Sequence, residues 1–211
     1  MIFYTLNFRL GKCMKVVFVP GNGNSTTRDN WFPSLKTELQ DKGIEVIAAD
    51  FPDPDLARES IWIPFLLDEL KVDQDTILVG HSSGAVASLR LAEENKILGS
   101  VLVGVYHTDL DMAREKASGY FNRDWKWDKI RNNQKWVSIF ASQDDPWIPI
   151  DQARHIHQYL SCEYHEFTNQ GHFGGDYVKV TFPELTLSIL NNIQFPKGAS
   201  KKNILLTEFN I

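Results

Sequence analysis

The chain has 211 residues and a formal net charge of −5, with 43% hydrophobic and 23% charged residues. A chain of this length and ordinary globular composition can bury the core of a single large domain. The acidic balance offers no basic face to nucleic acid, and no apolar stretch is long enough to span a bilayer.

The N-terminal residues do not read as a secretory leader, because no basic residues precede their apolar run and Asn7 and Arg9 interrupt it. The two cysteines, Cys13 and Cys162, are too few and too distant in sequence for a disulfide framework or a zinc site. Both observations favour a reducing, cytoplasmic location.

A second methionine, Met14, directly precedes the first convincing strand. We therefore expect a single domain over residues 14–193, with an N-terminal extension over 1–13 and a C-terminal tail over 194–211. No internal repeat or low-complexity tract divides the domain further.

Strand-like runs alternate with amphipathic stretches along this domain. The predicted strands cover residues 15–19, 45–49, 76–79, 98–104, 135–141 and 162–167. Apolar residues at helical spacing predict helices near 31–39, 61–70, 85–94, 150–160 and after Pro183, with Gly43 as a C-terminal cap of the first. This alternation predicts an α/β fold with three layers, in which a six-stranded, mostly parallel sheet carries helices on both faces. Ligands of such sheets bind at the carboxyl ends of the strands.

The segment Gly80-His81-Ser82-Ser83-Gly84 lies between the strand at 76–79 and the helix at 85–94. Gly-x-Ser-x-Gly in this context is typical of a nucleophile elbow, a sharp turn that exposes the serine hydroxyl above the sheet. The two glycines allow the turn and the close approach of strand and helix. Ser82 is therefore the predicted nucleophile; the alternative is a tight turn without chemistry.

A serine hydroxyl needs a base within hydrogen-bond reach and an acid that orients the base. In this architecture the order along the chain is serine, acid, histidine. Asp144 and Asp145 follow the strand at 135–141, and His172 follows the strand at 162–167. His172 is the preferred base, because no other histidine follows both the last strand and a glycine.

Either aspartate could orient His172. Asp145 begins a D-P-W-x-P loop that aims its carboxylate back toward the histidine, so it is the preferred acid. Asp144 is then expected to bond to backbone amides of its own turn. His81, beside the nucleophile, is expected to pack against the elbow rather than to react.

Two backbone amides are needed to stabilise the oxyanion of an acyl-transfer reaction. The amide of Ser83 comes with the elbow. The amide of Asn22 is our choice from the loop after the first strand, because Gly21 and Gly23 free the backbone on either side. A Gly-x-Gly loop could also cradle phosphate, but Thr26 stands where the dinucleotide fingerprint requires a third glycine.

Residues 106–127 are polar and aromatic, and they follow the fourth strand, where a lid or substrate loop would lie. The sequence does not fix their path. Most aromatic side chains near the predicted site are expected in the core or the lid. A few are expected to line an apolar pocket beside Ser82, and the candidates for substrate binding are Trp62, Tyr120, Trp147 and Phe173.

Taken together, several motifs resemble the retinoblastoma-binding protein nine family of small serine hydrolases. The likeness covers about residues 14–193 and rests on Val19-Pro20-Gly21-Asn22-Gly23, Ala57-Arg58-Glu59-Ser60-Ile61-Trp62, Gly80-His81-Ser82-Ser83-Gly84, Ala117-Ser118-Gly119-Tyr120-Phe121, Asp144-Asp145-Pro146 and Gly171-His172-Phe173. The resemblance implies an α/β-hydrolase fold and a triad of Ser82, Asp145 and His172. It also implies that the motifs at 58–62 and 117–121 lie near the active-site side.

The sequence departs from this family at one element. The human namesake binds retinoblastoma protein through L-x-C-x-E, but the matching stretch here, Leu70-Lys71-Val72-Asp73-Gln74, has neither the cysteine nor the glutamate. Binding to a pocket protein of that kind is therefore not expected.

These observations predict a serine hydrolase of the carboxylesterase or amidase type. It would cleave a small acyl substrate through an acyl-enzyme intermediate and would need no metal or cofactor. One alternative is a catalytically weak protein of the same fold that acts as a binding module. The other is a flavodoxin-like domain that binds a mononucleotide at the loop over 21–24.

Overall fold

The computed structural model describes residues 14–175 and 178–194, so the expected extension over 1–13 and residues 195–211 of the expected tail lie outside the described residues. Its sheet has the strand order β2-β1-β3-β4-β5-β6, and every neighbouring pair is parallel. The strands are β1 (Lys15–Val19), β2 (Glu45–Ile47), β3 (Thr76–His81), β4 (Gly99–Val103), β5 (Trp136–Ser142) and β6 (Glu163–Phe167). The predicted α/β class with six parallel strands is confirmed, while a single domain over 14–193 stays a prediction.

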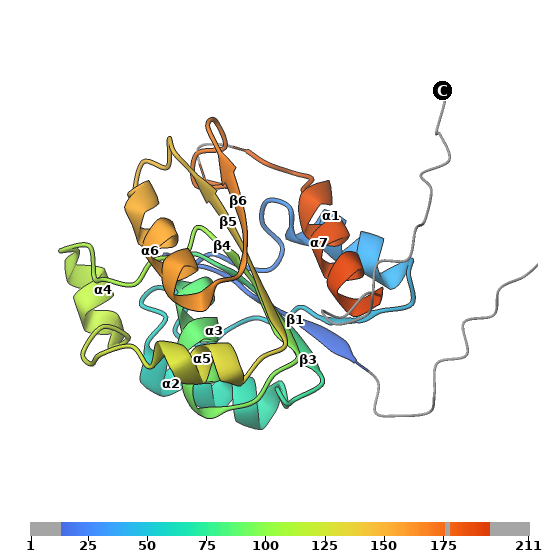
Figure 1. The fold of residues 1–211 in the computed structure, drawn as a ribbon, viewed down its shortest axis with the longest axis horizontal. Helices are drawn as coiled ribbons and strands as arrows, with labels where there is room; N and C mark the ends of the chain where they lie inside the picture. The colour runs from blue at the N-terminus through green and yellow to red at the C-terminus, as the bar shows by residue number, and fades with distance from the viewer. Residues whose placement is uncertain (1–13, 176–177, 195–211) are drawn as a thin grey trace, which may run out of the picture.

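Helices cover both faces of this sheet (Figure 1). Helices α1 and α7 lie side by side on one face, and α2, α3, α5 and α6 lie on the other. The helical elements are α1 (Phe32–Gln40), α2 (Glu59–Pro64), the π-helical turn η1 (Phe65–Glu69), α3 (Ser83–Glu94), α4 (Ala113–Ser118), α5 (Trp127–Asn132), α6 (Ile150–Leu160) and α7 (Pro183–Gln194). Within the described ranges, none of these helices is long and apolar enough to cross a bilayer.

The central strands are apolar throughout because successive side chains point into two different cores. On β1, Val17 and Val19 belong to the core under α3, whereas Val16 and Phe18 belong to the core under α1 and α7. All of these side chains are fully buried, and each contributes about 1.5–3 kcal/mol of hydrophobic free energy. The pattern fixes which helices can cover each face of the sheet.

Helix α1 ends in the cap that the sequence predicts at Gly43. The N–H of Gly43 donates to the carbonyl of Gln40 (2.9 Å), and the N–H of Ile44 donates to the carbonyl of Leu39 (3.1 Å). This pair of hydrogen bonds defines a Schellman motif, in which the capping residue adopts a left-handed conformation. Gly43 has a φ of +77°, which glycine adopts without the steric cost of a Cβ.

The continuous helix predicted over 61–70 is wrong in one respect, because it divides at Pro64. Proline has no N–H and its ring crowds the preceding turn, so regular α-helical bonding cannot run through it. Beyond Pro64 the spacing widens, and the N–H of Leu70 donates to the carbonyl of Phe65 (3.0 Å), the bond of a π-helix.

Arg90 of α3 fixes the path of residues 106–127, which the sequence leaves open. Its buried guanidinium donates to the backbone carbonyls of Tyr120 (2.7 Å), Arg123 (2.8 Å) and Asp124 (3.2 Å). The same group lies 3.5 Å from the ring centroid of Trp125, a cation–π contact. The segment that carries α4 is therefore fastened to the helix that starts at the elbow.

Candidate active site

The predicted site residues lie at the carboxyl edge of the parallel sheet. Ser82 directly follows β3, Asp145 comes three residues after β5, and His172 comes five residues after β6. Asn22 lies in the loop between β1 and α1. Parallel strands end at one edge, so residues distant in sequence converge there.

Ser82 occupies a strained backbone conformation, with φ 55° and ψ −123°. Conformations of this kind cost about 1–3 kcal/mol and persist only where the surroundings impose them. Here the N–H of Ser82 donates to the carbonyl of Val103 on β4 (2.9 Å), and α3 begins at the next residue. The side chain is partly exposed at this turn, as the sequence predicts for an elbow.

The two glycines of the motif allow the close packing that imposes this turn. A Cβ at Gly80 would lie 2.5 Å from the carbonyl oxygen of Gly84, and a Cβ at Gly84 would lie 2.2 Å from the carbonyl oxygen of Val19. Real Cβ atoms essentially never approach other atoms this closely. Any larger residue at either position would therefore push β3, α3 and the end of β1 apart.

His172 and Asp145 form a buried hydrogen-bonded pair. His172 Nδ1 lies 2.7 Å from Asp145 Oδ2, and the two side chains are 5% and 3% exposed. The other carboxylate oxygen accepts the N–H groups of Trp147 (2.9 Å) and Ile148 (3.0 Å), which fix its orientation. A carboxylate only accepts hydrogen bonds, so Nδ1 carries the proton and Nε2 is left with a lone pair.

The imidazole of His172 also lies close to the elbow. Its ring centroid is 4.8 Å from that of His81, the residue before Ser82. Within the described part of the chain, the hydroxyl of Ser82 itself makes no hydrogen bond. The His172–Asp145 pair thus lies beside the elbow without a hydrogen bond to the hydroxyl of Ser82, and hydrogen bonds of this kind often tighten only when a substrate binds.

His81 packs against the elbow, as expected, and also supports the base. Its Nε2 lies 2.8 Å from the carbonyl oxygen of His172. A carbonyl only accepts, so Nε2 carries the proton of this ring. Burial, and then the neighbouring His172, lower the pKa of His81 to about 3. His81 is therefore a neutral donor that holds the backbone of the base in place.

Asp144 bonds to a different segment from the one the sequence predicts. Its Oδ1 accepts the hydroxyl of Ser142 (2.6 Å) and the N–H groups of Gly171 (2.9 Å) and Gln170 (3.1 Å). The amides that it binds thus belong to the loop that carries His172, not to its own turn. The Ser142 hydrogen bond is the main cause that holds the pKa of Asp144 below its usual range.

Both predicted oxyanion donors lie beside the elbow. A Cβ at Gly21 would lie 3.3 Å from the Cβ of Ser82, so the loop that carries Asn22 runs against the nucleophile. Among the described residues, the N–H groups of Asn22 and Ser83 donate to no other group. The two free amides are available to a ligand at Ser82.

Three of the four aromatic candidates for substrate binding are buried in the cores. Trp62, Tyr120 and Phe173 have no exposed surface, so none of them offers area to a ligand in this structure. Trp147 differs, because it is 47% exposed and its ring meets that of His172 edge-on at 4.9 Å between centroids. The structure therefore brings only Trp147 to the base as an accessible surface.

The motif at 58–62 makes ion pairs and a hydrogen bond to neighbouring segments, and the motif at 117–121 is bound by Arg90 through the carbonyl of Tyr120. Glu59 of α2 pairs with Arg123 (2.8 and 2.5 Å), and Trp62 Nε1 donates to the carbonyl of Pro52 (2.7 Å). Arg58 pairs with Asp53 in a forked geometry (2.8 and 2.9 Å). These contacts hold backbone segments together rather than presenting groups to a ligand.

Sequence reasoning missed two polar residues that contact the oxyanion loops. Glu115 accepts the side-chain amide of Asn22 (2.7 Å), and Tyr106 contacts the hydroxyl of Ser83 (3.0 Å). Both belong to the segment after β4, whose polar and aromatic composition was the only signal in the sequence.

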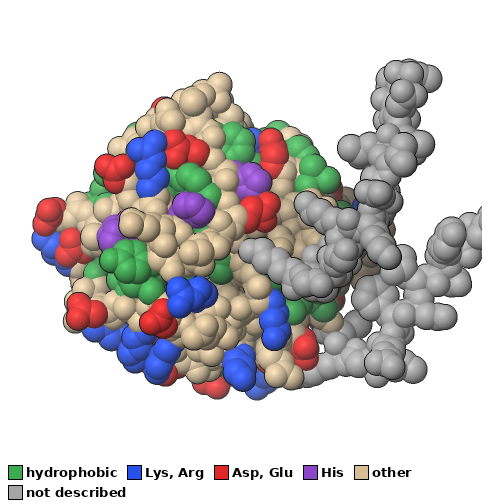
Figure 2. All heavy atoms as spheres, in the orientation of Figure 1, with side chains coloured by type: hydrophobic (Ala, Val, Ile, Leu, Met, Phe, Trp, Pro, Cys, Tyr) green, Lys and Arg blue, Asp and Glu red, His purple; other side chains and the backbone are tan. Residues whose placement is uncertain are grey.

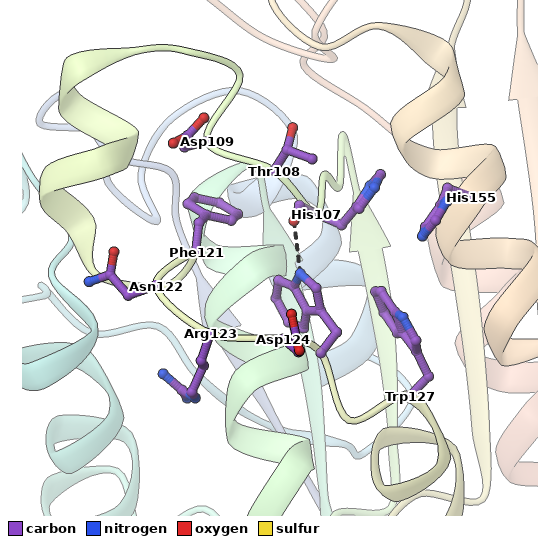
Figure 3. Close-up of a pocket in the computed structure, with 10 residues that line it drawn as sticks. His107, Thr108, Asp109, Phe121, Asn122, Arg123, Asp124, Trp127 and His155 are labelled. Atoms are coloured by element: carbon purple, nitrogen blue, oxygen red, sulfur yellow. Dashed lines mark hydrogen bonds between the residues drawn. The ribbon is translucent and has the colours of Figure 1, made fainter.

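A cavity of about 580 Å³ opens between the segment 106–127 and α6 (Figure 3). Phe121 and Trp127 form aromatic walls, and His107 stacks on His155 with 3.9 Å between ring centroids. On the face that carries α5 and α6, Figure 2 shows hydrophobic and histidine side chains side by side. In the described ranges, no group of three or more His, Cys, Asp or Glu side chains is arranged to hold a metal ion.

Comparison with known proteins gives concordant matches. A family model described as serine hydrolase matches residues 16–188. Serine hydrolase RBBP9 of Rattus norvegicus is 41% identical over 161 residues, which cover 75% of this chain and 87% of that protein. Putative hydrolase YdeN of Bacillus subtilis (strain 168) is 28% identical over 167 residues, covering 75% and 86%.

Solved structures support the same fold. The ydeN gene product of B. subtilis has a TM-score of 0.77 at 24% identity, covering 85% of this chain and 99% of that chain. A putative hydrolase of the alpha/beta superfamily from Xanthomonas campestris pv. campestris has a TM-score of 0.59 at 14% identity, covering 85% and 98%. The expected α/β-hydrolase fold is confirmed.

The elbow geometry predicts unequal effects of two glycine substitutions. Gly84→Ala should destabilise the fold by about 3 kcal/mol or more, because its methyl group would overlap backbone atoms that cannot rotate away. Gly43→Ala is the matched control: it also loses a glycine, but no atom lies within 4 Å of the added Cβ. Its cost should be the left-handed conformation alone, about 1–2 kcal/mol. Urea unfolding measures both, and equal losses would contradict the packing described here.

The buried neutral state of His81 predicts a dependence of stability on pH. The unfolded imidazole has a pKa of about 6.5, whereas the folded one has a pKa of about 3. As pH falls from about 6.5 toward 3, the unfolded chain gains a proton that the folded chain does not, so stability falls by about 1.4 kcal/mol per unit. His81→Gln should make this slope shallower by about that amount in urea unfolding between pH 7 and 5. Parallel slopes for both proteins would show that His81 is not buried in the neutral form.

Proposed function

The chain belongs to the serine hydrolase family, as its motifs predict, and from this premise we propose that Ser82, His172 and Asp145 are its catalytic triad. The observation that carries the proposal is the buried hydrogen bond between His172 Nδ1 and Asp145 Oδ2 (2.7 Å) beside the strained turn of Ser82. We propose that the reaction is hydrolysis of a small ester or amide through an acyl-enzyme intermediate. No metal or cofactor takes part in this chemistry.

In the first half of the reaction, the oxygen of Ser82 attacks the carbonyl carbon of the substrate while His172 Nε2 accepts the hydroxyl proton. Asp145 keeps the proton on Nδ1, which leaves the lone pair of Nε2 available to the nucleophile, and its negative charge stabilises the imidazolium that forms. His172 then gives the proton to the leaving group as the tetrahedral intermediate collapses. Water repeats these steps on the acyl-enzyme and regenerates the serine.

The negative oxygen of each tetrahedral intermediate would accept the N–H groups of Ser83 and Asn22. The N–H of Ser83 stands at the start of α3, where the helix dipole also favours a negative charge. Asn22 follows Gly21, whose backbone runs so close to Ser82 that an added Cβ would lie 3.3 Å from the Cβ of the serine. Donors fixed in advance need no reorganisation when the charge develops, and this supports their role.

Two features guide the choice of substrate. The segment 106–127 is fastened to α3 by Arg90, so this wall of the site has a fixed path. Trp147 presents an exposed aromatic surface against His172, where it can contact the group bonded to the scissile carbonyl. We therefore propose a short acyl ester or amide, with Trp147 as the substrate-contacting aromatic residue.

A fluorophosphonate probe tests the nucleophile directly, because it reacts with an activated serine. The wild-type protein should be labelled at Ser82, and Ser82→Ala should lose both the label and the hydrolysis of short acyl esters. Ser34→Ala, which removes a hydroxyl on α1, should be labelled like the wild type. Absence of labelling and of ester hydrolysis in the wild type would favour a binding module that keeps the fold without turnover.

The two aspartates should differ strongly in their effect on turnover. Asp145→Asn should lower kcat by about 10³–10⁴-fold, since an amide cannot hold the required tautomer of His172. Asp144→Asn should lower it by less than about 10-fold, because its side-chain oxygen can still accept the amides of Gln170 and Gly171. Steady-state kinetics on one short ester compare the two, and the reverse ranking would assign the acid to Asp144.

A further inference from the structure

Glu115 is a buried carboxylate on α4 that the triad does not use. It is 6% exposed, and acidic side chains are almost never buried to this degree without a partner. In the part of the chain that the structure describes, none of the ion pairs involves Glu115. Its partners are neutral donors from two other segments, so the burial of its charge needs an explanation other than a salt bridge.

The first partner lies in the loop after β1. The side-chain amide of Asn22 donates to Glu115 Oε1 (2.7 Å), across 93 residues of sequence. The backbone of this loop is also held by hydrogen bonds from the N–H groups of Gly23 and Asn24 to the carbonyls of Asp55 and Pro54 (3.0 Å each). The Glu115 hydrogen bond adds a restraint on Asn22 itself, whose own backbone N–H donates to no other group among the described residues.

The second partner leads to the elbow. The hydroxyl of Tyr106 donates to Glu115 Oε2 (2.6 Å). The oxygen of this Tyr106 hydroxyl also lies 3.0 Å from Ser83 Oγ. The hydroxyl of Tyr106 has one proton, and it donates this proton in the hydrogen bond to the carboxylate. The hydroxyl of Ser83 is therefore the donor in the bond between Ser83 and Tyr106. Burial, and then the charge of Glu115, raise the pKa of Tyr106 well above its usual value, which keeps this hydroxyl protonated as a donor.

Both arms of this network end on the residues whose backbone amides are the proposed oxyanion donors. We infer that Glu115 is a positioning residue of the oxyanion hole, which sets the relative placement of the Asn22 and Ser83 amides through Asn22 and Tyr106. The inference rests on the proposed hydrolase function. Hydrogen-bond donors act on a developing charge only when they are held within a fraction of an ångström, and one shared carboxylate between two loops provides that restraint.

The network makes a specific kinetic prediction for Glu115→Gln. Glutamine has the same shape, but it offers a single acceptor oxygen and adds an N–H₂ group, so it cannot accept from Asn22 and Tyr106 with both of its terminal atoms. With p-nitrophenyl acetate as substrate, we expect kcat to fall about 10- to 100-fold while KM changes less than about 3-fold. Tyr106→Phe removes only the arm to Ser83 and should give a smaller fall in kcat.

A double variant distinguishes a positioning role of Glu115 from a role in stabilising α4 alone. The double variant Glu115→Gln/Tyr106→Phe should lose less than the product of the two single losses, because both act through the same restraint. Lys116→Ala, on the exposed side of the same helix, should keep wild-type kcat and KM. A structural role alone would lower stability or raise KM and leave kcat unchanged, which would overturn the inference.

Three further outcomes complete the test. An increase in kcat for Glu115→Gln would mean that its negative charge opposes the oxyanion, and it would also overturn the inference. If Glu115→Gln does not fold, Asn22→Ala, which removes the side-chain arm but keeps the backbone N–H, must show the same fall in kcat at similar KM. If the wild-type protein neither takes the fluorophosphonate label at Ser82 nor cleaves the ester, the hydrolase proposal itself is refuted, and the inference is refuted with it. If the wild-type protein is active and Glu115→Gln has the same kcat, only the inference is refuted.

Discussion

Between the end of β1 and the start of α3 there is no room for a single methyl group, since a Cβ at Gly84 would lie 2.2 Å from the carbonyl oxygen of Val19. The close packing of β1 against α3 forces the chain to turn within one residue after β3, which places Ser82 at φ 55° and ψ −123°. The strain of that conformation, about 1–3 kcal/mol, is offset by strands and a helix that are buried almost throughout. The same close packing brings the loop after β1 against Ser82, so the positions of the proposed nucleophile and of one proposed oxyanion donor both depend on it.

His172, the proposed base, lies on a loop and is held there by side chains from several elements. Asp145 binds the ring of His172, while Asp144 binds the backbone just before it. His81 donates to the carbonyl of His172, and Trp31 donates to the carbonyl of Phe173 (3.0 Å). The two adjacent acids therefore bind different groups: Asp145 binds the imidazole and Asp144 binds the main chain. These contacts restrain a loop that would otherwise place its side chains less precisely than a strand does.

Secondary structure could be predicted from the sequence where the local residue pattern and the tertiary contacts favour the same element. The strand at 15–19 and the helix at 150–160 match β1 and α6, because buried apolar runs and amphipathic spacing carry their own signal. The convergence of the predicted serine, acid and histidine positions also follows from topology, because parallel strands end at one edge. The division at Pro64 could have been anticipated from the missing N–H of proline.

Other features depend on partners far away in sequence and left no local trace. Asp144 reaches an amide 27 residues away, and Glu115 reaches Asn22 across 93 residues. The aromatic residues Trp62, Tyr120 and Phe173 show the reverse case, since proximity to site motifs says nothing about whether a ring faces solvent or the core. The path of residues 106–127 could not be predicted either, because it depends on the buried Arg90 of α3, which is distant in sequence.

Arg90 binds the segment 106–127 mainly through its backbone. Arg90 donates to three main-chain oxygens, at positions 120, 123 and 124, and contacts one side chain of the segment, the ring of Trp125. Carbonyl groups are the same in every amino acid, so these three hydrogen bonds do not depend on the residue type at those positions. The side chain at 124, which lines the neighbouring cavity, can therefore be exchanged without loss of these hydrogen bonds, whereas Arg123 is also needed for its ion pair with Glu59.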